Sequence, residues 1–162
     1  MIQALLMKQE NQENTMPPSR LLTLDSNVLI AALKKDEPQS DRCAAILKKV
    51  PAQFLLTEPS IFYEEVCGTL ARRVSLEVAD EARRRLDRIV SFDRVVQCDK
   101  TFCLSAYPLC HEYELYAIDA LYLKTALDCN AILVSLDERD FVKKVKSRPS
   151  SIEAFEPTDF PY

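Results

Sequence analysis

Two aspartates stand where buried strands are expected to end. Asp25 follows the apolar run 21–24 directly, and Asp137 follows the apolar run 131–134 after two residues. Short apolar runs are typical of buried parallel strands, whose carboxyl ends lie at the same edge of a sheet. An aspartate after a strand is, taken alone, more often a helix cap. Two of them at one edge can meet in space and offer hard oxygen ligands to a divalent cation.

A third aspartate, Asp119, lies in the apolar stripe of a helix predicted for residues 115–129. Its same-face neighbours one turn away, Leu115 and Leu123, are both apolar. A carboxylate in an apolar stripe is costly unless it is paired or binds a cation. The alternative is a first-turn acid that interacts favourably with the helix dipole.

Two adjacent glutamates, Glu64 and Glu65, fall on a helix predicted to run from residue 57 to about residue 73. They flank its apolar stripe on opposite sides, so periodicity does not choose between them. Either one alone is more often a solvated surface acid.

The composition excludes several classes of protein. The 162 residues are 48% hydrophobic and 28% charged, which suits one globular domain. The net charge of −4 argues against a passive, charge-driven RNA-binding module. A single histidine rules out a two-histidine ribonuclease and an HExxH metalloprotease. A single glycine rules out Gly-rich phosphate-binding loops.

The six cysteines include no CxxC pair, and nothing in the first residues resembles a signal peptide. We therefore expect reduced cysteines in the core of a cytoplasmic protein. Cys110 and His111 lack further ligands at zinc spacing, so a zinc site there is not expected. No apolar run approaches the roughly 20 residues of a membrane helix.

The elements that must position the acids alternate between strands and helices. Ser26, Ser75 and Asn130 are predicted helix caps, and Pro38 and Thr57-Glu58-Pro59 are predicted helix starts. This alternation predicts an α/β fold whose central, mainly parallel sheet carries helices on both faces. The predicted strands are 21–24, 54–56, 95–96, 131–134 and 151–155, and the predicted helices are 26–33, 38–50, 57–73, 75–90, 100–111, 115–129 and a short basic helix after residue 137.

Four segments resemble, in order and spacing, the motifs of the PIN-domain family, and most closely its VapC-type toxins. The resemblance covers roughly residues 21–145, and residues 93–112 match no motif. It implies a three-layer α/β/α PIN domain over residues 21–162, preceded by a tail of residues 1–20 that is longer than usual for the family. The segments are LLTLDSNVLI, EEVCGTLARR, AIDALYLKTA and ILVSLDERDF.

The resemblance also assigns a site. It implies four acids that bind one or two Mg²⁺ or Mn²⁺ ions, namely Asp25, Glu65, Asp119 and Asp137. Glu65 is preferred over Glu64 because an aliphatic residue usually follows the family's glutamate. It further implies three supporting residues, namely Asn27, Ser135 and Asp140.

The activity that the resemblance implies is metal-dependent hydrolysis of RNA, leaving a 5′-phosphate and a 3′-hydroxyl. It implies a homodimer and a small antitoxin protein as partners. Phosphate contacts are predicted for basic residues near the site, among them Arg72, Arg73, Lys143 and Lys144. The arginines at 83–85 are interleaved with acids and instead predict a solvated helix face.

Other functions stay open. A haloacid-dehalogenase-type phosphatase would need a second aspartate at position 27, where this chain has asparagine. The paired acids and late lysine of a response-regulator receiver are not found. A non-catalytic PIN-like binding module and a solitary RNA-processing nuclease remain alternatives to a toxin.

Overall fold

Strand β1 (Arg20–Leu24) lies inside a parallel sheet, and its sequence explains that position. Leu22 and Leu24 are fully buried, as expected for a strand covered on both faces. β1 pairs with β2 on one side and with β5 on the other, and β6 extends the sheet beyond β5. All three pairings are parallel. The neighbouring strands are β2 (Phe54–Leu56), β5 (Ile132–Val134) and β6 (Ala154–Phe155).

The computed structural model describes residues 20–149 and 151–162. The predicted tail of residues 1–20 therefore lies outside the described residues, except that Arg20 begins β1.

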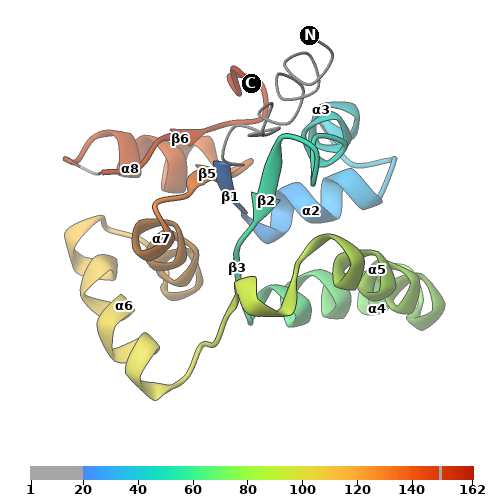
Figure 1. Ribbon diagram of the computed structural model, residues 1–162, viewed down its shortest axis with the longest axis horizontal. Helices are drawn as coiled ribbons and strands as arrows, with labels where there is room; N and C mark the ends of the chain where they lie inside the picture. The colour runs from blue at the N-terminus through green and yellow to red at the C-terminus, as the bar shows by residue number, and fades with distance from the viewer. Residues whose placement is uncertain (1–19, 150) are drawn as a thin grey trace, which may run out of the picture.

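Helices cover both faces of the sheet, as predicted for a three-layer α/β/α fold (Figure 1). One face carries α2 and α3, which pack against each other, and the other carries α7, which contacts β1 and β5 and is backed by α6. These four helices are α2 (Ser26–Leu33), α3 (Ser40–Leu47), α6 (Lys100–Glu112) and α7 (Ala117–Cys129). Between β5 and β6 the chain forms η3 (Glu138–Val142), a π-helical turn, and then α8 (Lys143–Lys146).

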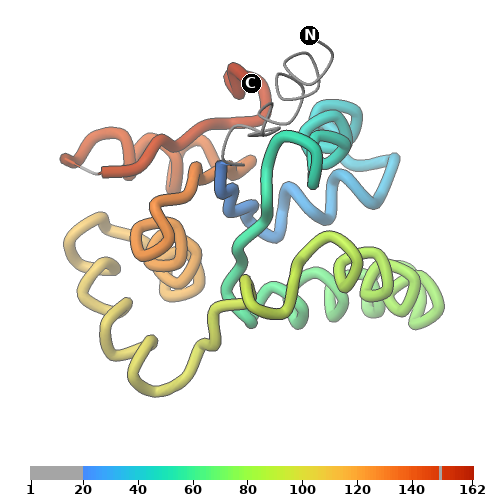
Figure 2. Tube along the Cα trace, in the orientation of Figure 1, coloured from blue at the N-terminus to red at the C-terminus, as the bar shows by residue number. Residues whose placement is uncertain are grey.

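The prediction that Thr57-Glu58-Pro59 begins a helix is wrong. Glu58 and Pro59 form strand β3, which pairs in parallel with β4 (Val95–Val96) in a separate two-stranded sheet. Figure 2 shows the chain returning after α5 to lie beside this segment. Proline fits a strand at an edge, where its missing N–H is not needed. Residues 95–96 are thus a strand as predicted, but outside the main sheet.

The predicted helix over residues 57–73 accordingly begins later and is irregular. A π-helical segment, η1 (Glu64–Gly68), leads into α4 (Thr69–Arg73). Helix α5 (Leu76–Ile89) follows, and a 3₁₀ turn, η2 (Phe92–Arg94), precedes β4.

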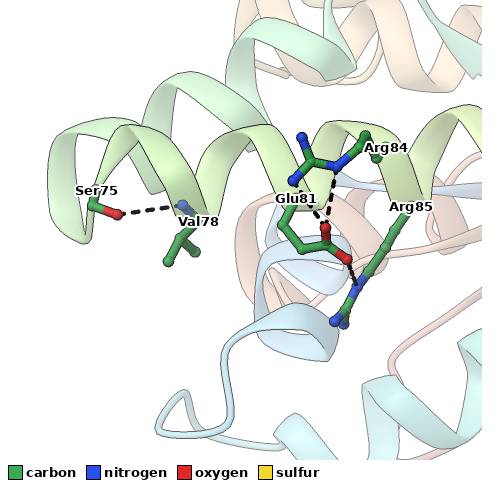
Figure 3. A network of polar contacts seen from close by, with 5 residues as sticks. All are labelled: Ser75, Val78, Glu81, Arg84 and Arg85. Carbon is green, nitrogen blue, oxygen red and sulfur yellow. Dashed lines mark hydrogen bonds and ion pairs between the residues drawn. The ribbon is translucent and has the colours of Figure 1, made fainter.

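The predicted caps had mixed outcomes. Ser75 caps α5 by accepting a hydrogen bond from the Val78 N–H at 3.3 Å (Figure 3). Asn130 ends α7 in the left-handed conformation, with φ 49°. Ser26 is instead the first residue of α2, with Asp25 at the cap position. The second helix begins at Ser40 rather than Pro38 because Gln39 takes a left-handed φ of 62°.

All six cysteines are free thiols, as expected. Cys43 is buried, but the prediction that the cysteines are core residues is wrong for Cys103, which is exposed on α6. Across residues 20–149 and 151–162, no helix has the length and apolar character needed to cross a membrane.

Candidate active site

Asp25 lies at the carboxyl edge of the sheet, where its backbone N–H still donates to the Val134 carbonyl at 2.9 Å. Its carboxylate makes no capping hydrogen bond to α2, so the helix-cap interpretation is wrong for this residue. Asp25 Oδ2 instead accepts from Ser135 Oγ at 2.6 Å and from Asn27 Nδ2 at 2.7 Å. With only 6% of its surface exposed, Asp25 is a buried acid held in a fixed orientation.

Asn27 and Ser135 connect this acid to the loop after β5. Asn27 Oδ1 accepts from the Leu136 N–H at 3.1 Å, and Ser135 Oγ accepts from the Asp137 N–H at 3.0 Å. Each side chain therefore contacts Asp25 and also the segment that carries Asp137. The structure places both residues where the family resemblance expected support for the acids.

The structure separates Glu65 from Glu64. Glu65 is partly buried and accepts a hydrogen bond from the Tyr122 hydroxyl at 2.7 Å, whereas Glu64 is exposed. Tyr122 is fully buried on α7, one turn after Asp119. Sequence reasoning missed Tyr122, because a tyrosine in the apolar stripe of a helix is indistinguishable from an ordinary core residue.

Asp119 lies in the first turn of α7, so the helix-dipole interpretation also holds. Burial, together with the negative charges of Asp137 and Glu65, raises its pKa to about 6. Burial raises the pKa of Asp25 to about 7, against the hydrogen bond from Ser135, with contributions from Asp119 and Glu65. These mutual effects define the acid cluster, namely Asp25, Glu65, Asp119 and Asp137.

Asp137 and Asp140 have local roles as well. Asp137 Oδ1 accepts from the Asp140 N–H at 2.8 Å and caps η3, so the cap interpretation holds here. Asp140 is 3.3 Å from Lys144 Nζ, one turn along the chain. Its carboxylate is therefore neutralised by a lysine instead of adding charge to the cluster.

Glu58 is a fifth acid that sequence reasoning missed. It is fully buried, and its Oε1 accepts from the Leu24 N–H at 2.9 Å, directly before Asp25. Its Oε2 has no hydrogen-bond partner within the described residues. Burial, aided by the charge of Asp25, raises the pKa of Glu58 well above its ordinary value. Burial therefore favours the protonated form of this acid, which packs behind the cluster.

The donor set fits a hard divalent cation. Within the described ranges, no three His, Cys, Asp or Glu side chains are arranged to hold one ion as they stand. Mg²⁺ does not require three, because it keeps several waters and binds through one or two carboxylates. Burial, and after it the charges of neighbouring carboxylates, raise the pKa values of Asp25 and Asp119, and a bound cation would offset both effects.

The predicted phosphate-binding cations differ in their surroundings. Lys143 pairs with Glu138, and Lys144 is occupied by Asp140 and by the Glu114 carbonyl. Arg72 and Arg73 are exposed at the end of α4.

The arginines of α5 pair with acids on their own helix, as predicted for a solvated face. Glu81 accepts from both Arg84 and Arg85, at 3.0–3.2 Å (Figure 3).

A known protein family matches the part of the chain that carries these acids. The family model described as PIN domain matches residues 22–146, which include every acid of the cluster. The chain belongs to the PIN domain family. This PIN domain has no match among curated proteins.

Solved structures resemble this PIN domain along most of their length. VapBC2 from Rickettsia felis, bound to a promoter DNA fragment, is 18% identical, with 84% of this chain and 98% of that one covered and a TM-score of 0.60. A toxin–antitoxin complex from Klebsiella pneumoniae is 20% identical, with 83% and 99% covered and a TM-score of 0.60. A sarcin-ricin loop cleaving VapC toxin from Mycobacterium tuberculosis is 15% identical, with 70% and 86% covered and a TM-score of 0.58. The VapC-like fold predicted from the sequence motifs is confirmed.

Proposed function

We propose that this PIN domain is a metal-dependent ribonuclease that hydrolyses phosphodiester bonds of RNA. The observation that carries the proposal is the acid cluster, in which carboxylates from four separate segments influence one another's charge at one edge of the sheet. Asp25, Glu65, Asp119 and Asp137 are the proposed ligands, and one or two Mg²⁺ or Mn²⁺ ions are the proposed cofactor. A bound cation supplies an activated water and stabilises the charge that develops on the phosphate.

The chain's own residues prepare the site in three ways. Ser135 and Asn27 donate to one oxygen of Asp25, Oδ2, and the other oxygen, Oδ1, lies 3.4 Å from Ser26 Oγ. The Tyr122 hydroxyl, on α7, likewise donates a hydrogen bond to Glu65 and fixes the orientation of its carboxylate. Because these donors are themselves anchored, the ligands need little reorganisation, which is the usual basis of electrostatic preorganisation.

We further propose that the protein is the toxin of a toxin–antitoxin pair in the cytoplasm. Support comes from the solved relatives, which include VapBC and other toxin–antitoxin complexes of matching length. A homodimer and a small antitoxin are the proposed partners. An acidic site of this kind is electrostatically suited to an inhibitor that inserts a basic side chain.

Cleavage of a mixed single-stranded RNA by the full chain tests the activity. We expect cleavage with Mn²⁺ or Mg²⁺, none with EDTA, and a loss of at least a hundredfold in Asp25→Asn and Asp119→Asn. The matched control is Asp36→Asn, an exposed acid outside the cluster. Cleavage that survives both cluster variants would point to a contaminating nuclease, and no cleavage by any variant would favour a non-catalytic PIN-like binding module.

A further inference from the structure

A hollow of about 410 Å³ opens beside Asp25, between α2 and α4. We call it the Arg73 hollow. Its wall combines hydroxyl, amide, guanidinium and carboxylate groups with an apolar edge from the β5–η3 loop, and the residues that matter here are Ser26, Asn27, Glu37, Thr69, Arg73 and Leu136. This volume is within the usual range of small-molecule sites.

The hollow is continuous with the acid cluster through Asn27. This residue lines the hollow and also donates to Asp25 Oδ2 at 2.7 Å. Ser26 does the same, with its Oγ 3.4 Å from Asp25 Oδ1. By contrast, the two hollows against α5, which are lined by Leu33 and Arg85, include no residue of the cluster or its hydrogen-bond donors. A ligand in the Arg73 hollow would therefore lie next to any phosphate bound at the acids.

Arg73 gives the hollow its affinity for an anion. More than half of its side chain, 54%, is exposed. Its nearest acid is Glu37 at 3.9 Å, and that carboxylate is already bonded to Lys34 at 2.9 Å. The guanidinium thus keeps donors free for a phosphate, in the fork geometry that suits one. The predicted alternatives Lys143 and Lys144 are engaged by acids or carbonyls of the chain.

We propose that the Arg73 hollow binds the nucleotide adjoining the scissile phosphate of RNA, with Arg73 on its phosphate and the polar wall around its base. This inference rests on the proposed nuclease function and names the part of the surface that holds its substrate.

Binding without cleavage tests the hollow. The full chain is titrated, in EDTA, into a fluorescently labelled 12-nucleotide single-stranded RNA of mixed sequence while anisotropy is recorded. Arg73→Gln is expected to weaken binding about tenfold and to lower the slope of log K against log salt by about 0.7, the value for one lost phosphate contact on a single strand. Thr69→Glu, which adds a carboxylate one helical turn before Arg73 on α4, where it can pair with the guanidinium, should also weaken binding. Arg88→Gln, at an exposed arginine of α5 that does not line the hollow, is the matched control and should change the affinity less than twofold.

Two further readouts separate the possible outcomes. A nucleoside 5′-monophosphate should compete for the labelled RNA more strongly than inorganic phosphate at equal concentration; equal competition would overturn the nucleotide assignment. In Mn²⁺, Arg73→Gln should raise KM and leave kcat within about twofold, as expected for uniform binding.

Unchanged binding and KM in Arg73→Gln and Thr69→Glu would overturn the hollow while the nuclease stands. Equal losses in Arg88→Gln and Arg73→Gln would also overturn it, because a general charge effect would then explain the binding. RNA bound in an Arg73-dependent manner but never cleaved would instead refute the nuclease and keep the hollow.

Discussion

Replacing Glu58 by glutamine is expected to make the metal-free protein more stable at pH 7. The side chain is fully buried, with one oxygen bonded to the Leu24 N–H and the other without a partner in the described chain. Burial raises its pKa well above the ordinary 4.5, so the folded protein keeps a proton that the unfolded chain releases. Glutamine has the same shape, keeps an acceptor for Leu24 and does not titrate.

The sign and size of the effect follow from proton linkage. A carboxyl group whose pKa is higher in the folded than in the unfolded protein stabilises the fold fully at pH values below its unfolded pKa. That contribution is lost as the pH rises towards its folded pKa. One such proton lowers the free energy of unfolding by about 1.4 kcal/mol per pH unit over that window. The free energy of unfolding of the Glu58→Gln variant should therefore fall less steeply with rising pH than that of the wild type, by about 1.4 kcal/mol per pH unit. For a chain of this size that is roughly 3–6 °C in melting temperature per pH unit.

The assay is urea or thermal unfolding in EDTA at half-unit steps from pH 5 to pH 8. Asp25 and Asp119 titrate in both proteins, so the difference between the two curves isolates Glu58. Glu112→Gln, on the exposed surface of α6, is the control and should leave the pH dependence unchanged. Parallel curves, or a glutamine variant that is less stable at pH 7, would show that Glu58 is charged in the folded protein and refute the reasoning.

Three other predictions concern the site. Asp25→Asn should abolish cleavage yet raise the melting temperature in EDTA at pH 8, because a buried charge with a pKa of about 7 is removed; a lower melting temperature would mean that the charge stabilises the fold. Tyr122→Phe should lower cleavage about tenfold and stability by about 1 kcal/mol, because Glu65 loses the hydroxyl donor at 2.7 Å; unchanged kinetics would show that Tyr122 does not position Glu65. Cleavage should rise between about pH 6 and pH 8, as Asp25 and Asp119 lose the protons that compete with the cation, and a rate that is flat over this range would contradict the metal-ligand roles.

The placement of the acids could be predicted because their positions follow from local pattern and topology. Asp25 and Asp137 end two apolar runs, and parallel strands bring their carboxyl ends to one edge. Asp119 is conspicuous as a charge among apolar neighbours. Glu65 could not be separated from Glu64 by periodicity, and in the structure the turn is π-helical, so the assumed 100° spacing does not apply there.

What sequence reasoning missed depends on contacts between distant segments. Thr57-Glu58-Pro59 has the local signature of a helix start, but pairing of Glu58 and Pro59 with Val95 and Val96 decides the conformation. The burial of Glu58 follows from that pairing and from its bond to Leu24, neither of which is local. Local propensity is a weak prior where tertiary packing intervenes.

Mn²⁺ titration calorimetry of the full chain at pH 7.5 measures whether carboxylates from four segments share a divalent cation. We expect saturable binding of one or two ions that is lost or weakened at least tenfold in Asp25→Asn and in Asp119→Asn, and retained in Asp36→Asn. Binding of equal affinity in all four proteins, or no binding to the wild type in the presence of RNA, would contradict it.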